Sequence, residues 1–174
     1  MSRTFYLSIV VWGVVSLVAA WTDAGPFAPA PPRVPEEALS LSGLTRFQLG
    51  TIPLTPLLRE ADVKVESLVK LIARQLQQEG ISLGEDPLLP RLSLVILTDT
   101  NPDQRGAVSL TTIMAVHQKA HINRIDRSLT VPTATTGNTA LTTRKGLSDA
   151  VEQSVQRAVQ TLLDYMNWVS RPEH

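Results

Sequence analysis

An alternating segment from Ala107 to about Asn123 places the tightest limit on what this chain can fold into. One set of its alternate side chains is Val108, Leu110, Thr112, Met114 and Val116, and the other is Ser109, Thr111, Ile113, Ala115 and His117. Successive side chains of a β-strand point to opposite faces, so the pattern predicts one long strand with its more apolar face turned to a core. Such a strand needs a sheet, and the sheet needs other elements to cover its apolar face.

Three further segments are predicted to be strands. Leu44–Leu54 alternates weakly and is the expected first strand. Arg91–Thr98 has apolar side chains on both faces, so we expect it to be central in the sheet. Arg127–Thr136 alternates again, and the threonine-rich stretch from there to Thr143, which contains the turn-type pair Gly137-Asn138, is expected to be a loop or a frayed edge.

Two segments have helical periodicity. Asp62–Glu79 is followed by Gly80, a residue that ends helices cheaply because it adopts the left-handed conformation. Leu147–Val169 is longer and carries one continuous apolar face. The order β-α-β-β-β-α predicts an α+β fold, a mainly antiparallel sheet of about four strands with two helices packed on one face. The expected apolar stripes are Val65, Leu68, Val69, Ile72 and Leu76 in the first helix, and Leu147, Val151, Val155, Ala158, Val159, Leu162, Met166 and Val169 in the second.

The N-terminal segment predicts export. Arg3 precedes an apolar run from Phe5 to Ala20 that ends in small side chains, as in a cleaved signal peptide, so residues 1–20 are assigned to a signal. The alternative is a retained single-pass membrane anchor that faces out of the cytoplasm, although the run is slightly short for a span. Residues 21–42 are rich in proline and alanine and predict an extended linker, which leaves residues 43–170 for a single domain.

Composition excludes several classes of protein. The chain has no cysteine, so it has neither disulfides nor the thiol that a lipid anchor requires. Its 16 basic residues balance its 16 acidic ones, which gives no global electrostatic case for nucleic acid as a partner.

No catalytic apparatus is visible in the sequence. Nucleophile-elbow, phosphate-loop and dinucleotide-binding motifs are all absent, so we expect a protein that is not an enzyme, with no catalytic residue and no cofactor. His117 and His121 lie four residues apart on one predicted strand, near Asp126 in the sequence. That spacing is about 13 Å along a strand, too wide for one tetrahedral ion, so we expect no metal site.

Charge is unevenly spread along the chain. Between Gln104 and Val151 there are six basic residues against two acidic ones. The functional interpretation is a surface that binds anions, and the alternative is a sheet edge protected by charge against pairing with other strands. The residues proposed for binding are His117, Lys119, His121, Arg124 and Arg127.

The element order resembles that of small auxiliary lipoproteins of the cell envelope, of the lipopolysaccharide-assembly and lipid-transport type. The resemblance spans roughly residues 43–169 and is carried by a helix that ends at Gly80-Ile81, an acidic proline-containing loop, and Pro90-Arg91-Leu92-Ser93-Leu94 entering a long antiparallel pair. It implies a non-enzymatic accessory role in the periplasm. This chain lacks the lipidated cysteine of those proteins, and no functional residue is carried over.

Two functions follow as hypotheses. The first is an exported, non-catalytic accessory protein of the envelope that binds another envelope protein, or an anionic lipid or glycan, through its sheet. The second is a small periplasmic carrier that holds an apolar or anionic ligand between helices and sheet. A sealed core favours the first hypothesis and a deep apolar pocket the second. Membrane association is expected only if the N-terminal segment is retained.

Overall fold

The computed structural model of the protein describes residues 35–100 and 106–170. These residues belong to the second of two compact units of the chain, Val34–His174. The predicted signal peptide, its cleavage after Ala20 and most of the predicted linker lie outside the described residues, as do Gln104 and Arg105 at the start of the basic segment. None of the described helices is long and apolar enough to cross a membrane.

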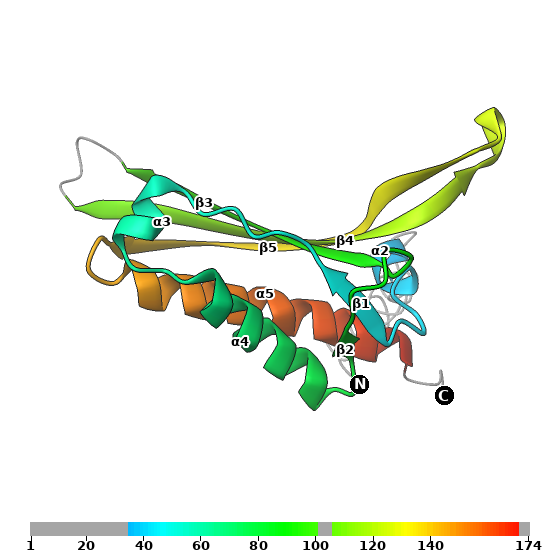
Figure 1. Cartoon of the computed structure of the whole chain (residues 1–174), viewed down its shortest axis with the longest axis horizontal. Helices are drawn as coiled ribbons and strands as arrows, with labels where there is room; N and C mark the ends of the chain where they lie inside the picture. The colour runs from blue at the N-terminus through cyan, green and yellow to red at the C-terminus, as the bar shows by residue number, and fades with distance from the viewer. Residues whose placement is uncertain (1–34, 101–105, 171–174) are drawn as a thin grey trace, which may run out of the picture. The chain divides into compact units, whose positions relative to one another are not determined.

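The described chain forms one mixed sheet with helices against it (Figure 1). The strand order is β2-β1-β3-β4-β5, in which β1 runs parallel to both of its neighbours while β3, β4 and β5 are antiparallel. The α+β class is therefore confirmed, with five strands in place of about four. In chain order the elements are α2 (Glu36–Leu39), β1 (Arg46–Leu49), α3 (Pro56–Glu60), α4 (Val65–Gln78), β2 (Ser82–Leu83), β3 (Arg91–Thr100), β4 (Ala107–Ile122), the 3₁₀ helix η1 (Asn123–Ile125), β5 (Arg127–Thr143) and α5 (Leu147–Ser170).

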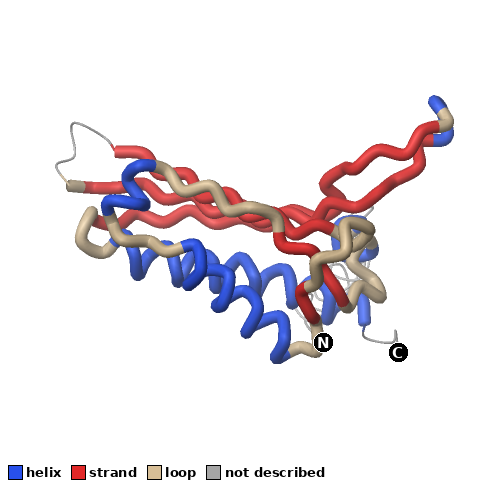
Figure 2. Tube along the Cα trace, in the orientation of Figure 1, coloured by secondary structure: helices blue, strands red, loops and turns tan. Residues whose placement is uncertain are grey.

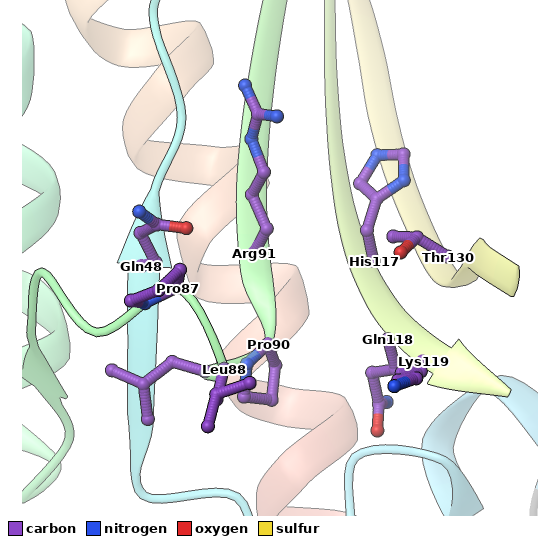
Figure 3. A pocket seen from close by; sticks show the side chains of 10 residues that line it. Gln48, Pro87, Leu88, Pro90, Arg91, His117, Gln118, Lys119 and Thr130 are labelled. Atoms are coloured by element: carbon purple, nitrogen blue, oxygen red, sulfur yellow. The ribbon is translucent and has the colours of Figure 1, made fainter. Parts of the chain in front are cut away.

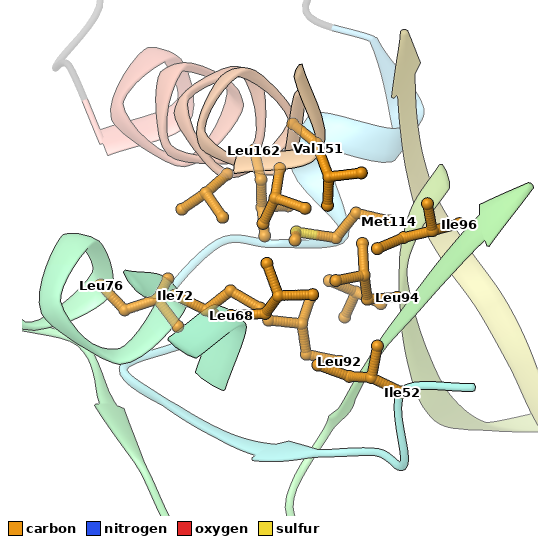
Figure 4. Packing of buried hydrophobic residues seen from close by; sticks show 14 of the residues in the cluster. Ile52, Leu68, Ile72, Leu76, Leu92, Leu94, Ile96, Met114, Val151 and Leu162 are labelled. Atoms are coloured by element: carbon orange, nitrogen blue, oxygen red, sulfur yellow. The ribbon is translucent and has the colours of Figure 1, made fainter. Parts of the chain in front are cut away.

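The two long helices, α4 and α5, lie side by side on one face of the sheet and enclose the core (Figures 1 and 4). The predicted helix faces are confirmed, because Leu68, Ile72 and Leu76 of α4 are buried along with most of the apolar stripe of α5. The predicted face of β4 is confirmed as well, since Val108, Leu110, Thr112, Met114 and Val116 are all buried. Gly80 has the left-handed backbone conformation, with φ of +75°, just after α4 ends.

The C-terminal part of β5 corrects one prediction. The stretch to Thr143 is strand, not a loop or frayed edge, and it pairs with β4 along its whole length. Asn138 does not turn the chain but faces α5, where its amide donates to the backbone oxygen of Ser154 at 2.9 Å. Gly137 permits close pairing, because a Cβ there would lie 3.2 Å from the carbonyl oxygen of Thr112. A glycine followed by an asparagine is typical of a turn in sequence, but here the asparagine bonds a helix and the glycine allows close pairing with a strand.

The N-terminal part of the described chain differs from prediction in two places. Residues 36–42 were assigned to the linker, yet they include α2 and bury both Ala38 and Leu41 in the fold. The predicted first strand, Leu44–Leu54, is shorter, because only Arg46–Leu49 is strand. Pro56 begins helix α3, since proline suits the first turn of a helix.

Among the described residues, no long helix lies over the opposite face of the sheet (Figure 2). Strand β3 is central, as predicted, with β1 on one side and β4 on the other. Its inward side chains, Leu92, Leu94 and Ile96, are buried, whereas Leu97 on the outward face is 51% exposed. The apolar character of both faces therefore identified the central strand correctly, although only one face is covered.

The pair β4–β5 continues past the rest of the sheet as a two-stranded arm, residues Gln118–Val131, including η1 at its tip (Figures 1 and 2). A register shift between Val116 and His117 marks its base, where the ribbon bends away from the helices. No residue from His117 to Thr133 is buried. The arm is thus held by its own backbone ladder and not by a core.

Candidate functional site

A pocket of about 450 Å³ lies at the base of the arm (Figure 3). We call it the elbow pocket. Side chains from four strands and from the loop before β3 meet there, because the arm bends away at this point and leaves the ends of β1 and β3 uncovered. Its lining residues are Gln48, Pro87, Leu88, Leu89, Pro90, Arg91, His117, Gln118, Lys119 and Thr130.

The polar part of the lining is cationic. Arg91 and Lys119 carry full positive charges, His117 lies with them, and none of the described residues that line the pocket carries a carboxylate. Arg91 stands directly opposite His117 in the β3–β4 register, which is why the two side chains share this site. Neither Arg91 nor Lys119 forms an ion pair within the described part of the chain. A guanidinium and an ammonium group without carboxylate partners can bind a phosphate, sulfate or carboxylate group.

Local packing sets the positions of the two cross-strand partners. A Cβ added at Gly50 would lie 2.8 Å from Nε of Arg91, so the absence of a side chain there makes room for the guanidinium. Nε2 of His117 lies 2.9 Å from Oγ of Ser93, a hydrogen bond that fixes the imidazole ring against β3.

Gln118 fastens the base of the arm to the N-terminal helix. Its Nε2 donates to the backbone oxygen of Ser40 at 2.8 Å, just after α2, and to Oγ1 of Thr133 at 2.7 Å. Ser40 in turn donates through Oγ to the backbone oxygen of Thr133 at 3.2 Å. This small network bridges the register shift in the β4–β5 pair, so the direction of the arm is held by side chains at its base.

Three residues of the predicted binding set lie farther out on the arm. His121 pairs with Asp126, with Nε2 3.4 Å from Oδ1, and both side chains are more than half exposed. Arg124 lies in η1 at the tip, and Arg127 follows where β5 begins, opposite Ile122. The arm therefore carries three full cations, Lys119, Arg124 and Arg127, against the single carboxylate of Asp126.

The structure thus divides the predicted set. His117 and Lys119 line the elbow pocket, whereas His121, Arg124 and Arg127 lie along the arm. Sequence reasoning missed Arg91 as a member of the site, because its place beside His117 depends on the β3–β4 register. The motif Pro90-Arg91 was visible in the sequence, but no pattern in it indicates the partner strand.

The Ser93–His117 contact joins two residue types that also occur in hydrolases. Oγ of Ser93 also lies 3.3 Å from the backbone oxygen of Ala115, which is a second acceptor within reach of its single proton. Within the described residues no carboxylate bonds the ring of His117, and no group of three or more metal-binding side chains is present. An activated nucleophile needs a base that is oriented by a third group, so we interpret this contact as one that holds the ring of His117 in place.

The space between helices and sheet is filled by side chains. Twenty-five buried apolar residues form one cluster there, and those drawn in Figure 4 interdigitate between α4, α5 and the sheet. This packing favours an interaction module over a carrier that holds its ligand between helices and sheet.

Protection of sheet edges explains the basic residues less well. The longest free edge in the described sheet is β5, and from Ser128 to Thr143 it has no charged side chain. Within the arm both strands are edges, so Lys119 and Arg127 could serve there as protection. That reason does not extend to Arg91, which lies on the central strand β3.

Comparisons with known proteins give low similarity throughout. No family model matches the chain, and no curated protein matches it. Among solved structures, a minor lipoprotein from Acinetobacter baumannii is 13% identical with a TM-score of 0.43, covering 75% of this chain and 96% of that one. The hypothetical protein CT253 from Chlamydia trachomatis is 10% identical with a TM-score of 0.41, covering 70% of this chain and 95% of that one.

The rare lipoprotein B from Shewanella oneidensis is 12% identical with a TM-score of 0.37, covering 71% of this chain and 95% of that one. The outline resemblance to small lipoproteins that the sequence indicated is thus found again among solved structures. Similarity at these TM-scores carries no argument about function.

Proposed function

We propose that this protein is an exported, non-catalytic accessory protein of the cell envelope that binds an anionic partner through the elbow pocket and the arm. The observation that carries the proposal is the meeting of Arg91, His117 and Lys119 in a pocket without a carboxylate. Two strands, β3 and β4, bring them together, so the cluster is a product of strand pairing and not of a charged run in the sequence.

The arm extends the same charge away from the body. Arg124 and Arg127 are exposed, and the only acid of the arm, Asp126, is already paired with His121. A partner that reaches the elbow pocket along the arm therefore meets three cations against the single carboxylate of Asp126. Exposed charges of this kind raise the association rate and make binding sensitive to salt.

Export is supported by the sequence of the N-terminal segment, whose apolar run over Phe5–Ala20 has the composition of a signal peptide. The partner is then an envelope component: another protein, or an anionic lipid or glycan. A protein that binds by charge on a preformed surface needs no cofactor, in agreement with a sequence that has no catalytic motif.

The test is retention on an immobilised polyanion, heparin, at low and high salt. The variant replaces Lys119, Arg124 and Arg127 by glutamine. Each cation near an anionic surface contributes about 1 kcal/mol, so the triple variant should bind about a hundredfold more weakly at low salt. Retention of the unmodified protein should fall as salt shortens the Debye length below about 8 Å.

A matched control removes the same net charge elsewhere. Lys64, Lys70 and Arg74 are exposed on or beside α4, and their replacement by glutamine should leave retention within about twofold of the unmodified protein. Equal losses in the two triple variants would show that net charge, and not this surface, governs binding. An unmodified protein that is not retained at all would also sink the proposal.

A further inference from the structure

The tip of the arm combines exposed aliphatic side chains with the cations already described. Ile125 in η1 and Leu129 early in β5 are each 44% exposed. No long helix of the described chain covers them, and the backbone ladder of the arm ends at η1 (Figure 1). These aliphatic side chains do not contribute to the packing of the core, because no residue of the arm is buried.

The cations surround these side chains in an ordered way. Arg124 precedes Ile125 directly, Arg127 follows it by two positions, and Lys119 lies nearer the base. Ile125 at the tip therefore has cations beside it, and Leu129, which pairs with Ala120, lies between Arg127 and Lys119 along the arm. Aliphatic side chains interspersed with three cations, against the single carboxylate of Asp126, suit the interfacial region of an anionic membrane, where apolar side chains lie close to lipid phosphates. An acidic protein would have to offer a shaped apolar site as well as charge, whereas a bilayer accepts a projecting tip without one.

We propose that the arm is a membrane-docking element, in which Ile125 and Leu129 enter the headgroup region of an anionic bilayer while Lys119, Arg124 and Arg127 contact lipid phosphates. This inference rests on the proposed function and names the partner as a lipid surface.

The absence of cysteine in the chain makes a direct test possible. Ile125→Cys, labelled with the environment-sensitive fluorophore NBD, reports whether the tip enters a bilayer. Leu141→Cys carries the same label as the control, because Leu141 is 73% exposed on β5 but lies beyond the arm. The full chain after signal removal is mixed with vesicles of phosphatidylglycerol and phosphatidylcholine, and separately with vesicles of phosphatidylcholine alone.

The label at position 125 should brighten and shift to shorter wavelength with phosphatidylglycerol vesicles, and it should respond little to phosphatidylcholine alone. The label at position 141 should stay unchanged with both. In parallel, Ile125→Ser with Leu129→Ser should lower sedimentation with anionic vesicles about tenfold or more, from the loss of two half-exposed aliphatic side chains. The same double variant should keep its retention on heparin within about twofold, since its charge is unchanged.

The outcomes separate this inference from the function on which it rests. Retention on heparin without any binding to vesicles would overturn the membrane inference but would still agree with the proposed binding of an anionic partner. Sedimentation with vesicles while the label at position 125 keeps its aqueous spectrum would also overturn insertion, because only surface charge would then be acting. If the unmodified protein binds neither heparin nor vesicles, the proposed function itself is refuted.

Discussion

Truncating Leu162 to alanine tests the central packing argument of the fold. Leu162 is 2% exposed on α5 and points into the cluster that holds Met114 of β4 (Figure 4). The change removes three buried carbon atoms at about 0.8 kcal/mol each, or about 2.4 kcal/mol, before any cavity is counted. A residual cavity adds to this, so the expected loss of unfolding free energy is about 2–5 kcal/mol.

Lys70→Ala is the matched control. Lys70 lies on α4, the neighbouring helix, but its side chain is exposed. Removal of an exposed side chain at a site without special contacts should cost under about 0.5 kcal/mol. Leu162→Met provides a second comparison, because a swap that conserves volume should cost less than about 1.5 kcal/mol.

The measurement is urea unfolding followed by far-ultraviolet circular dichroism. With slopes of about 1–3 kcal/mol per molar urea, Leu162→Ala should lower the midpoint by about 1 M or more, while Lys70→Ala should leave it nearly unchanged. Comparable losses for the two alanine variants would refute the assignment of the helix faces, and with it the placement of the core between α5 and the sheet.

Three further predictions address other parts of the chain. Gly80→Ala should cost about 1 kcal/mol in the same urea assay, because φ of +75° strains any side chain even though nothing lies within 4 Å, whereas the exposed control Gln78→Ala should cost less than half of that. Ser154→Ala should cost about 1–3 kcal/mol, because it removes the Oγ that lies 2.8 Å from the buried Oγ1 of Thr112 and leaves that hydroxyl without this partner. In the Ser154→Ala background, Thr112→Val should then cost less than it does in the unmodified protein, and strict additivity of the two changes would contradict this coupling. Protein recovered from the envelope should begin at Trp21 by intact mass, and recovery of the full-length chain in the membrane fraction would favour the anchored alternative.

The candidate site was only partly predictable. His117 and Lys119 were chosen from the local excess of basic residues and lie together in the elbow pocket. Arg91 was not predicted as part of the site, because it is distant from His117 in the sequence and lies beside it only through strand pairing. The role of Ile125 and Leu129 escaped as well, since an isolated aliphatic residue in a sequence does not reveal whether a core covers it.

Periodic patterns were sufficient by themselves to locate the long elements β3, β4, α4 and α5 and to assign the buried faces of β4 and of both helices. The alternation through Met114 set the buried face of β4, the spacing of Leu68, Ile72 and Leu76 set that of α4, and Gly80 marked the end of the helix. These features are local, because each depends on the geometry of one element and on which of its sides avoids water.

Tertiary structure decided what local patterns leave open. Asn138 can turn a chain or bond a helix, and the approach of α5 made it part of β5. Arg91 acquires a role only in the register that places it opposite His117, and the arm exists only because β4 and β5 continue after their neighbours end. Pairing and packing join residues that are far apart in sequence, and the free energy that selects one register belongs to all those contacts together, so no single segment encodes it.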